Sequence, residues 1–274
     1  MKTDAAKWST QVDCFDTDGR DAEPSGVSFA RDEENKSVIW PIFMQYVNQR
    51  KRFLGRNLRI LDFGCGTGSF CRRLALDGHT VVGVDANVDM IKRAIERDVN
   101  FLASYVDPDG LDEVTSEPFD MVVSLMVLQF VSEIDEMISR MGSRLTEEGI
   151  VVVAVHDDDY FRQMSGRHPK YVPPKPGSNP LEWTIVLNGE TFAVFLRGDV
   201  EYSEWFARRG LTMEGVQRVG SETSRKEWSE AGMSGEASPK LLIMTFSRDG
   251  SSEDPRPRNA RRTSSSSTPP NGPR

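Results

Sequence analysis

The chain has little cysteine and no long hydrophobic run, and both absences limit what it can be. Its 274 residues include only Cys14, Cys65 and Cys71. An odd number of cysteines without paired spacing supports neither a disulfide framework nor a zinc ribbon. The first residues lack an apolar signal segment, and runs such as Ile150 to Val155 are too short to span a membrane. We therefore expect a cytoplasmic protein with no membrane partner.

Basic residues are also in the minority. The chain has 34 Lys and Arg against 42 Asp and Glu, a formal net charge of −8. An acidic surface repels phosphate backbones, so the composition argues against a nucleic-acid partner. The segment 248–274 departs from this balance with six arginines and three acids. Because it is rich in Ser and Pro and buries little apolar surface, it is predicted to be a disordered tail.

The rest of the chain divides into an amino-terminal arm and one folded domain. Residues 1–30 are polar, with Trp8, Phe15 and Phe29 as their large anchors. This arm is predicted to be loosely ordered and is a candidate lid over a ligand, the alternative being a disordered start with ordinary aromatic residues. The domain itself is expected to cover residues 31–247.

Secondary-structure patterns in the domain alternate between strand and helix. An amphipathic helix is predicted over 37–53, and between Leu58 and Ala154 short Val, Ile and Leu runs alternate with helical patterns. Strands of this kind belong to parallel sheets that are covered on both faces. Two further strands are expected over 211–219 and 240–246. The fold class is therefore α/β, with a doubly wound, mostly parallel sheet.

An insertion at 156–198 interrupts the alternation. Residues 157–180 are rich in Pro, Gly and charge, and we interpret them as a long loop rather than a packing element. The pair Asn188-Gly189 lies between two β-like runs, which is a strong signal for a hairpin. The insertion is predicted to shape a binding pocket.

The loop after the first predicted strand is the most informative segment. Asp62 is followed by three glycines at alternate positions, Gly64, Gly66 and Gly68. Glycines here allow unusual backbone angles and close approach of a ligand. A dinucleotide fingerprint would need its third glycine where the chain has Ser69, so that pattern fails. The carboxylate of Asp62 would repel a pyrophosphate, but it suits a ligand that carries an ammonium group and a sulfonium centre.

The run Asp62-Phe63-Gly64-Cys65-Gly66-Thr67-Gly68 resembles the D-x-G-C-G-T-G motif of class I S-adenosylmethionine-dependent methyltransferases. Further similarities follow in the family's order, at 81–85 for the second strand, 119–128 for the fourth and 144–150 for the turn into the fifth. The resemblance covers roughly residues 59–155. It implies a Rossmann-like, seven-stranded sheet with an antiparallel last strand, and S-adenosyl-L-methionine as the cofactor.

The resemblance also implies a set of cofactor-binding residues. Asp85 ends the second strand, where the family binds the ribose hydroxyls, and Asp62 is placed to hold the methionine amino group. Many members carry an acid for the adenine amino group after the third strand, and we assign that position to Ser104 and Tyr105. The remaining positions lie in the loop, beside the adenosine or on the fourth strand: Gly64, Cys65, Gly66, Ala86, Met90 and Leu125.

The acceptor side departs from the family pattern. Many small-molecule members have a histidine pair after the fourth strand, whereas this chain has Leu128-Gln129-Phe130. His156 follows the GIVVVAV strand, and a neutral imidazole there could take a proton from an acceptor. A strand-end histidine bonded to backbone is the alternative. Three consecutive acids from Asp157 are typical of a solvated loop, so no metal site is expected.

These features predict an enzyme that transfers a methyl group from S-adenosylmethionine to an oxygen, nitrogen or carbon of a small-molecule acceptor, a metabolite or natural product. One alternative is an NAD(P)-dependent oxidoreductase on a Rossmann-like sheet. Another is a non-catalytic S-adenosylmethionine-binding protein. The sequence leaves the acceptor and the oligomeric state open.

Overall fold

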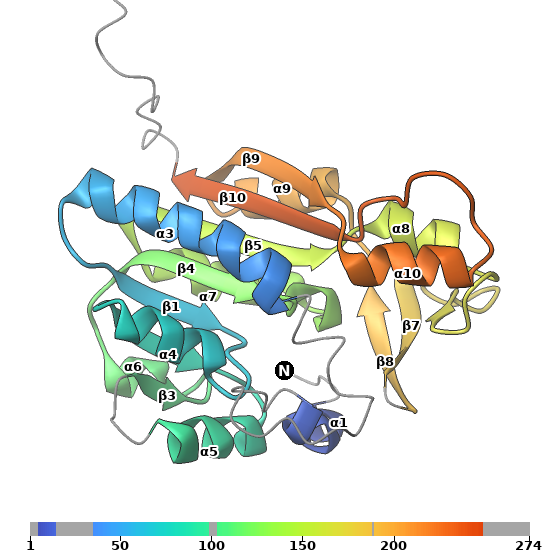
Figure 1. The fold of residues 1–274 in the computed structure, drawn as a ribbon. Helices are drawn as coiled ribbons and strands as arrows, with labels where there is room; N and C mark the ends of the chain where they lie inside the picture. The colour runs from blue at the N-terminus through green and yellow to red at the C-terminus, as the bar shows by residue number, and fades with distance from the viewer. Residues whose placement is uncertain (1–4, 15–34, 99–102, 188, 249–274) are drawn as a thin grey trace, which may run out of the picture.

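Seven strands form the main sheet of the computed structural model, which describes residues 5–14, 35–98, 103–187 and 189–248. Their order is β3-β2-β1-β4-β5-β10-β9, and β10 runs antiparallel to both of its neighbours. Figure 1 shows the first five strands ending at one common edge. The strands are β1 (Arg59–Phe63), β2 (Thr80–Val84), β3 (Ser104–Val106), β4 (Phe119–Leu125), β5 (Leu145–His156), β9 (Leu211–Val219) and β10 (Leu241–Arg248). The predicted fold class, including the antiparallel last strand, is confirmed.

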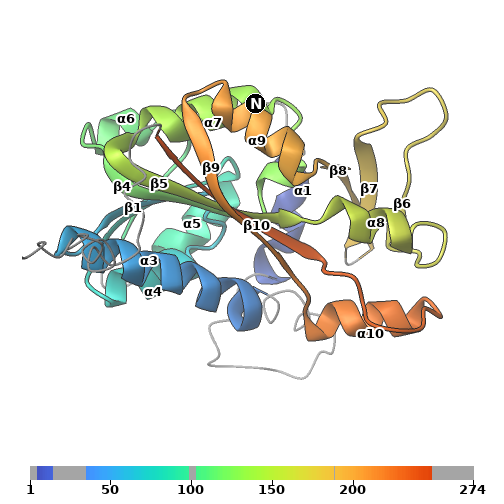
Figure 2. The same ribbon diagram turned by 90° about the horizontal axis from the view of Figure 1, so that it is seen from above.

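Helices cover both faces of this sheet (Figures 1 and 2). One face is covered by α3 (Trp40–Leu54), α4 (Ser69–Leu76) and α5 (Val88–Arg97). The other is covered by α6 (Leu111–Val114), α7 (Ile134–Ser143) and α9 (Asp199–Ala207). The long Val and Ile runs follow from this sandwich, because a central strand with two covered faces has no side that turns to water.

The helix predicted over 37–53 begins later than its apolar pattern. Residues Asn35–Ile39 form one π-helical segment, η2, and the α-helix α3 continues from Trp40 with Pro41 in its first turn. Proline is tolerated there because the first amide groups of a helix have no intrahelical acceptor. Gly55 ends the helix in the left-handed conformation, with φ of 67°.

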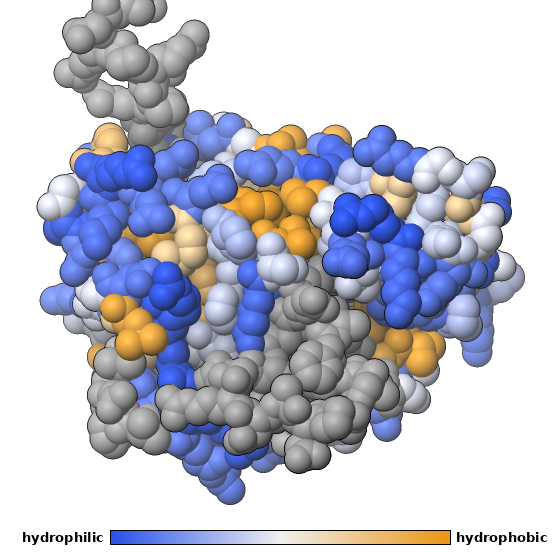
Figure 3. All heavy atoms as spheres, viewed as in Figure 1, coloured by the Kyte–Doolittle hydropathy of each residue, from blue (hydrophilic) through white to orange (hydrophobic). Residues whose placement is uncertain are grey.

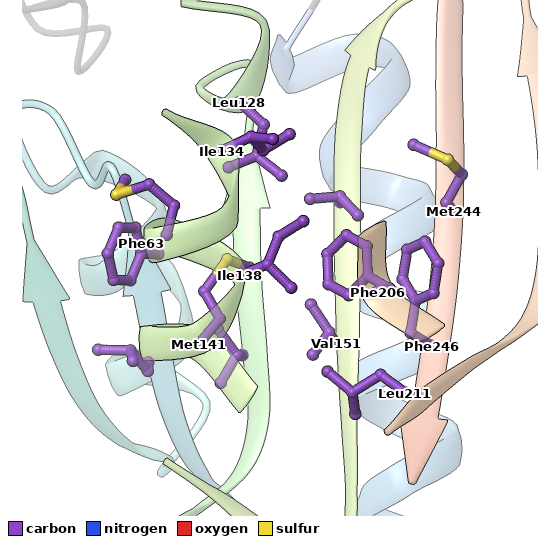
Figure 4. Packing of buried hydrophobic residues seen from close by; sticks show 14 of the residues in the cluster. Phe63, Leu128, Ile134, Ile138, Met141, Val151, Phe206, Leu211, Met244 and Phe246 are labelled. Carbon is purple, nitrogen blue, oxygen red and sulfur yellow. The ribbon is translucent and has the colours of Figure 1, made fainter. Parts of the chain in front are cut away.

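The larger core lies between the sheet and the α7 and α9 face (Figure 4). Apolar residues from β4, β5 and β10 interlock there with Ile138 and Met141 of α7. The Phe206 ring of α9 stacks on Phe246 of β10 with centroids 3.8 Å apart. A second core fills the α3, α4 and α5 face. The two cores hold the strands in place, and with them the residues at the strand ends.

A smaller antiparallel sheet stands beyond the carboxyl ends of β5 and β4 (Figure 1). It consists of β6 (Tyr171–Val172), β7 (Glu182–Leu187) and β8 (Glu190–Phe195). Leu187 pairs with Glu190 across the turn, which confirms the predicted hairpin. The helices α8 (Asp158–Met164) and α10 (Glu222–Glu230) enclose a third, aromatic-rich core with this sheet.

Two sequence interpretations in this region are corrected by the structure. Residues 157–180 were expected to lack a packing element, yet α8 buries Tyr160, Phe161 and Met164 completely. Polar residues at its start hid this helix, because Asp157 is its N-cap and accepts a hydrogen bond from the amide of Tyr160. The helix α10 was not predicted at all, since its nine residues are mostly polar.

The described part of the amino-terminal arm folds into α1 (Ala5–Trp8) and the 3-10 segment η1 (Ser9–Cys14). Phe15, Phe29 and the tail after Arg248 lie outside the described residues. Within the described ranges, no helix is long and apolar enough to cross a membrane.

Candidate functional site

The loop between β1 and α4 lies at the carboxyl edge of the sheet. Its three glycines all adopt left-handed backbone angles, with φ of 85° at Gly64, 55° at Gly66 and 75° at Gly68. The amides of Gly64 and Cys65 both donate to the carbonyl of Val84, at 2.7 and 3.0 Å, which ties the loop to the end of β2. Residues with a side chain rarely adopt such angles, so the sequence pattern is a requirement of this turn.

The three glycines differ in what surrounds them. A Cβ atom on Gly64 would lie 2.2 Å from Val127, and one on Gly68 would lie 2.6 Å from the ring of Tyr105. Around a Cβ atom on Gly66, no heavy atom from another described part of the chain lies within 4 Å. Gly64 and Gly68 therefore serve packing, whereas Gly66 borders open space in which a ligand can approach the backbone.

Asp62 is the buried acid at the end of β1, with 2% of its surface exposed. Its Oδ2 accepts a hydrogen bond from the Cys71 thiol at 3.3 Å, while its Oδ1 has no hydrogen-bond partner among the described residues. Desolvation, reinforced by the nearby charge of Asp85, raises the pKa of Asp62 to about 7. A cationic group would relieve both the missing hydrogen bond and the missing charge partner.

Two thiols pack beneath the loop. The Sγ atoms of Cys65 and Cys71 would both lie 2.9 Å from a Cβ atom on Gly83, so strand β2 needs glycine at this position. A hydrogen bond from Cys71 lowers the pKa of Cys65, but desolvation and the carboxylates of Asp85 and Asp62 outweigh it and raise the value to about 11. Burial also raises the pKa of Cys71. Neither thiol is an activated nucleophile.

Asp85 follows β2 and binds the glycine loop directly. Its Oδ2 accepts from the amide of Gly66 at 2.9 Å, and its Oδ1 accepts from the amide of Asn87 at 2.8 Å. Desolvation raises its pKa, although these two hydrogen bonds oppose the effect. Each carboxylate oxygen retains a second lone pair, so the group can accept two further hydrogen bonds from hydroxyls.

The N-cap of helix α5 is Asn87 rather than Asp85. The side chain of Asn87 accepts from the amides of Asp89 and Met90, at 2.9 and 3.0 Å. Asp85 is therefore not needed as a helix cap, and its carboxylate is committed to the edge of the sheet. Ala86 is exposed at this edge, whereas Met90 is buried in the first turn of α5.

Ser104 and Tyr105, which we matched to the family's adenine-binding position, lie within the third strand rather than after it. Strand β3 spans Ser104–Val106, so the residue that follows it is Asp107. The Tyr105 ring lies beneath the glycine loop, and its hydroxyl donates to the carbonyl of Gly68 at 3.5 Å. Asp107 was missed because Ser104 and Tyr105 were matched to the family position, although the strand-like run 101–106 extends past both of them.

The backbone is unusual directly after β4. Leu125 is the last residue of the strand and is partly buried, and Met126 has a φ of 60°, which is uncommon for a residue with a side chain. The amide of Met126 donates to the carbonyl of Ala154 at 2.8 Å. Strain of this kind is concentrated at functional sites, where the surrounding structure enforces it.

His156 is the last residue of β5 and lies next to this turn. It is buried, with 8% exposed, and pairs in register with Leu241 of β10. Its ring lies 4.9 Å from that of Phe161 and 6.5 Å from that of Phe130, measured between centroids. His156 therefore stands between the carboxyl edge of the main sheet and the aromatic residues of the insertion.

The acids that follow His156 belong to α8. Asp157 caps the helix and pairs with Arg218 of β9 at 3.0 Å, and Asp158 pairs with Arg162 at 3.3 Å. Nowhere in the described ranges do three His, Cys, Asp or Glu side chains gather as they would around a metal ion.

The amino-terminal segment crosses the open side of the site. Ser9 accepts a hydrogen bond from the Asn87 side chain at 3.1 Å, at the start of α5. Trp8 contacts Phe130 and Phe192, with centroid distances of 4.8 and 4.4 Å. The face in Figure 3 carries a hydrophobic patch near the amino end of α3, framed by hydrophilic residues. The segment thus joins the start of α5 to the smaller sheet.

Comparisons with known proteins agree with this geometry. A family model described as a methyltransferase domain matches residues 40–216. The chain is 33% identical over 102 residues to a ubiquinone biosynthesis O-methyltransferase of Bartonella tribocorum, covering 36% of this chain and 41% of that protein. It is 35% identical over 102 residues to the protein of the same name in Mesorhizobium japonicum, covering 35% and 40%. The chain thus spans about two fifths of the length of these curated relatives.

Solved structures support the fold. A magnesium protoporphyrin IX methyltransferase of Synechocystis, crystallised with bound SAH, superposes with a TM-score of 0.56 at 15% identity, over 90% of this chain and 95% of that one. An S-adenosylmethionine-dependent methyltransferase of Mesorhizobium loti gives a TM-score of 0.52 at 24% identity, over 70% and 91%. The family match covers more than half of the chain and decides against the nicotinamide alternative. The chain belongs to the class I S-adenosylmethionine-dependent methyltransferases.

Proposed function

We propose that this chain transfers the methyl group of S-adenosylmethionine to an oxygen, nitrogen or carbon of a small-molecule acceptor. The observation that supports this most is the meeting of Asp62, Asp85 and the glycine loop at one sheet edge. The unpartnered Oδ1 of Asp62 suits an ammonium donor, and Asp85 keeps lone pairs for two hydroxyls. Gly66 leaves room for the ligand to reach the loop.

We assign the adenine end of the cofactor to the turn after β3. Asp107 follows this strand at the same edge as Asp85, whose amide donates to the carbonyl of Val106 at 3.2 Å. Asp107 is exposed, and its Oδ1 accepts from the amides of Asp109 and Gly110, which holds the carboxylate in place. A carboxylate can accept a hydrogen bond from an exocyclic amino group.

The bound cofactor supplies a methyl group that is already reactive, because its sulfur is a sulfonium. The protein's contribution is alignment and exclusion of water. Asp62 and Asp85 fix two ends of the ligand, and the turn after β4 borders the acceptor side. A ring nitrogen of His156 would take a proton from the acceptor where the acceptor must lose one.

We further propose that residues 31–247 form the catalytic domain, and that the insertion 156–198 and the amino-terminal arm form the acceptor side. The contacts of Trp8 with Phe130 and Phe192 support a closed arm over the site. Burial of Phe161 and Trp183 in the third core supports a rigid wall rather than loose loops.

Isothermal titration of the full chain with S-adenosylmethionine and S-adenosylhomocysteine tests the first step. We expect both to bind, and Asp85→Ala to weaken both. If the intact protein binds neither ligand, or binds NAD(H) instead, the proposal fails. Product formation against a panel of acceptors tests the second step, because binding without turnover on any acceptor would favour the non-catalytic alternative.

A further inference from the structure

The turn after β4 joins the cofactor loop to the aromatic residues. At its start, Val127 packs directly on Gly64, as shown by the 2.2 Å distance from its Cγ2 to a Cβ atom built on that glycine. At its end, Phe130 contacts the rings of Trp8 and His156. Between them, Leu128–Phe130 form the 3-10 segment η3. Gln129 is therefore placed between the cofactor side and the aromatic side.

Gln129 is a buried amide without a hydrogen-bond partner. Only 1% of its surface is exposed, and neither its Oε1 nor its Nε2 bonds to any residue that the structure describes. Buried amides are almost always paired, because the unpaired group loses its hydration without compensation. Among the described residues, the side-chain amide of Gln129 has a free donor, Nε2, and a free acceptor, Oε1. It is suited to a ligand group that both donates and accepts a hydrogen bond.

The side chain of Arg197 holds the backbone of the turn that carries Gln129. Arg197, itself 6% exposed, donates to the carbonyls of Leu128, Val131 and Ser132 at 3.4, 2.9 and 3.1 Å. These three bonds engage both terminal nitrogens of the guanidinium with the backbone of the turn. The backbone that carries Gln129 is thus fixed on both sides of this residue.

The surroundings indicate what kind of ligand would meet this amide. The rings next to the turn, those of Trp8, Phe130 and Phe192, are uncharged, and Trp8 and Phe130 are only partly buried. Aromatic rings of this kind favour flat, apolar ligands. A charged acceptor would lose its hydration among these rings, and the neutral amide of Gln129 carries no charge that would compensate for the loss.

We propose that Gln129 recognises the acceptor, and that the acceptor is an aromatic ring that presents an uncharged hydroxyl group to this amide. The inference rests on the methyl-transfer function proposed above. The hydroxyl donates to Oε1 and accepts from Nε2, while the ring lies among the aromatic residues beside the turn. Gln129 acts as a specificity-determining residue.

The experiment compares three probes on one ring, 2-naphthol, 2-naphthoate and naphthalene, titrated into the full chain saturated with S-adenosylhomocysteine. We expect 2-naphthol to bind about tenfold more tightly than either of the others, and Gln129→Leu to abolish this preference. Equal affinities for 2-naphthol and naphthalene in the wild type, or an unchanged preference in Gln129→Leu, would overturn the inference while S-adenosylhomocysteine still binds. Failure of S-adenosylhomocysteine to bind would overturn the proposed function itself and this inference with it.

Thermal unfolding separates recognition from a structural role. Replacing an unpartnered buried amide with an apolar side chain of similar size removes a penalty, so Gln129→Leu should raise the unfolding midpoint of the cofactor-free protein. Gln49→Leu, the same change at an exposed site on α3, is the control and should leave both midpoint and probe affinity unchanged. A lower midpoint in Gln129→Leu would show that the amide supports the fold, and would count against recognition.

Discussion

At the scale of single residues, folding and ligand binding favour opposite protonation states of Asp62. The protein buries its carboxyl group with one oxygen unpartnered, and desolvation raises its pKa to about 7. The folded state therefore holds a proton that the unfolded chain has already lost near pH 4. Stability falls as the pH rises between these two values and levels off above 7. A bound ammonium group would reverse the preference, because it stabilises the carboxylate.

We expect Asp62→Asn to stabilise the cofactor-free protein at pH 8, by up to about 4 kcal/mol. The same change should weaken S-adenosylhomocysteine binding, because a neutral amide cannot pair with the ammonium group. Chemical unfolding at pH 5 and pH 8 measures the first effect, and calorimetric titration measures the second. A variant less stable than wild type at pH 8 would contradict this account of Asp62.

The pH dependence of cofactor affinity follows from the same group. We expect binding to require the Asp62 carboxylate, so the affinity for S-adenosylhomocysteine should rise as the pH increases through 7 and then level off. Titration calorimetry between pH 5.5 and pH 8.5 checks this. In Asp62→Asn the affinity should be nearly flat across that range, and an equal slope in both proteins would assign the titration to another group.

At the scale of elements, the glycine loop separates packing from binding. Gly64 and Gly66 both have left-handed backbone angles, so an alanine at either costs about 1 kcal/mol in backbone energy. They differ in surroundings, because only the Gly64 variant would place its methyl group against Val127. The pair thus offers matched variants with the same backbone cost.

We expect Gly66→Ala to fold with a loss of about 1 kcal/mol, yet to bind S-adenosylhomocysteine much more weakly, because the new methyl group occupies the open space beside the loop. Gly64→Ala should lose roughly 2–4 kcal/mol through overpacking against Val127. Urea unfolding and ligand titration on both variants check the pair. Similar stability losses in the two variants would show that the Val127 side chain moves aside at little cost in free energy.

The amino-terminal segment is the second element with a function to test. Trp8 is its main anchor on the smaller sheet, so Trp8→Ala should release α1 and accelerate dissociation of S-adenosylhomocysteine several-fold. Stopped-flow dissociation measures this. Thr10→Ala, which removes an exposed hydroxyl bonded within the segment, is the control. Equal dissociation rates for wild type and Trp8→Ala would exclude a lid role for the segment.

At the scale of the whole molecule, a buried acid links the two sheets. Glu227 of α10 accepts from the Tyr171 hydroxyl at 2.6 Å and pairs with Lys170 at 2.6 Å and with Lys240, which precedes β10, at 3.3 Å. Desolvation opposes its ionisation, but Lys240 and Lys170 outweigh this and hold the pKa of Glu227 well below its usual range. This network fixes α10 and the smaller sheet to the end of the main sheet.

We expect Glu227→Gln to destabilise the fold by about 3 kcal/mol, because it leaves the buried ammonium of Lys240 without its counter-charge. The wild type should lose this contribution on acidification below pH 4.5, where the unfolded chain takes up a proton that the folded state resists. The variant should show a flatter acid limb. Glu230→Gln, at an exposed position in the same helix, should change little, and an equal loss there would argue against the buried network.

Much of the main sheet could be predicted from local pattern. Val and Ile runs located β1, β2, β4 and β5, and the glycine spacing located the turn before α4, because these depend on neighbours along the chain. Asp107 was passed over because Ser104 and Tyr105 were matched to the family position, although both precede Val106, the last residue of the strand. The polar helices α8 and α10 were missed because only long-range packing reveals which of their residues are buried.

The sequence by itself determined the α/β class and the cofactor motif, because strand periodicity and left-handed glycines are local properties of the chain. Only the tertiary structure decided the surroundings of each side chain. It showed that Asp62 is buried with an open oxygen and that Asn87 rather than Asp85 caps α5. It also brought Gln129, His156 and Trp8 to one edge, since strands distant in sequence end side by side there. Burial and pairing depend on such distant contacts, and they set the chemistry of the site.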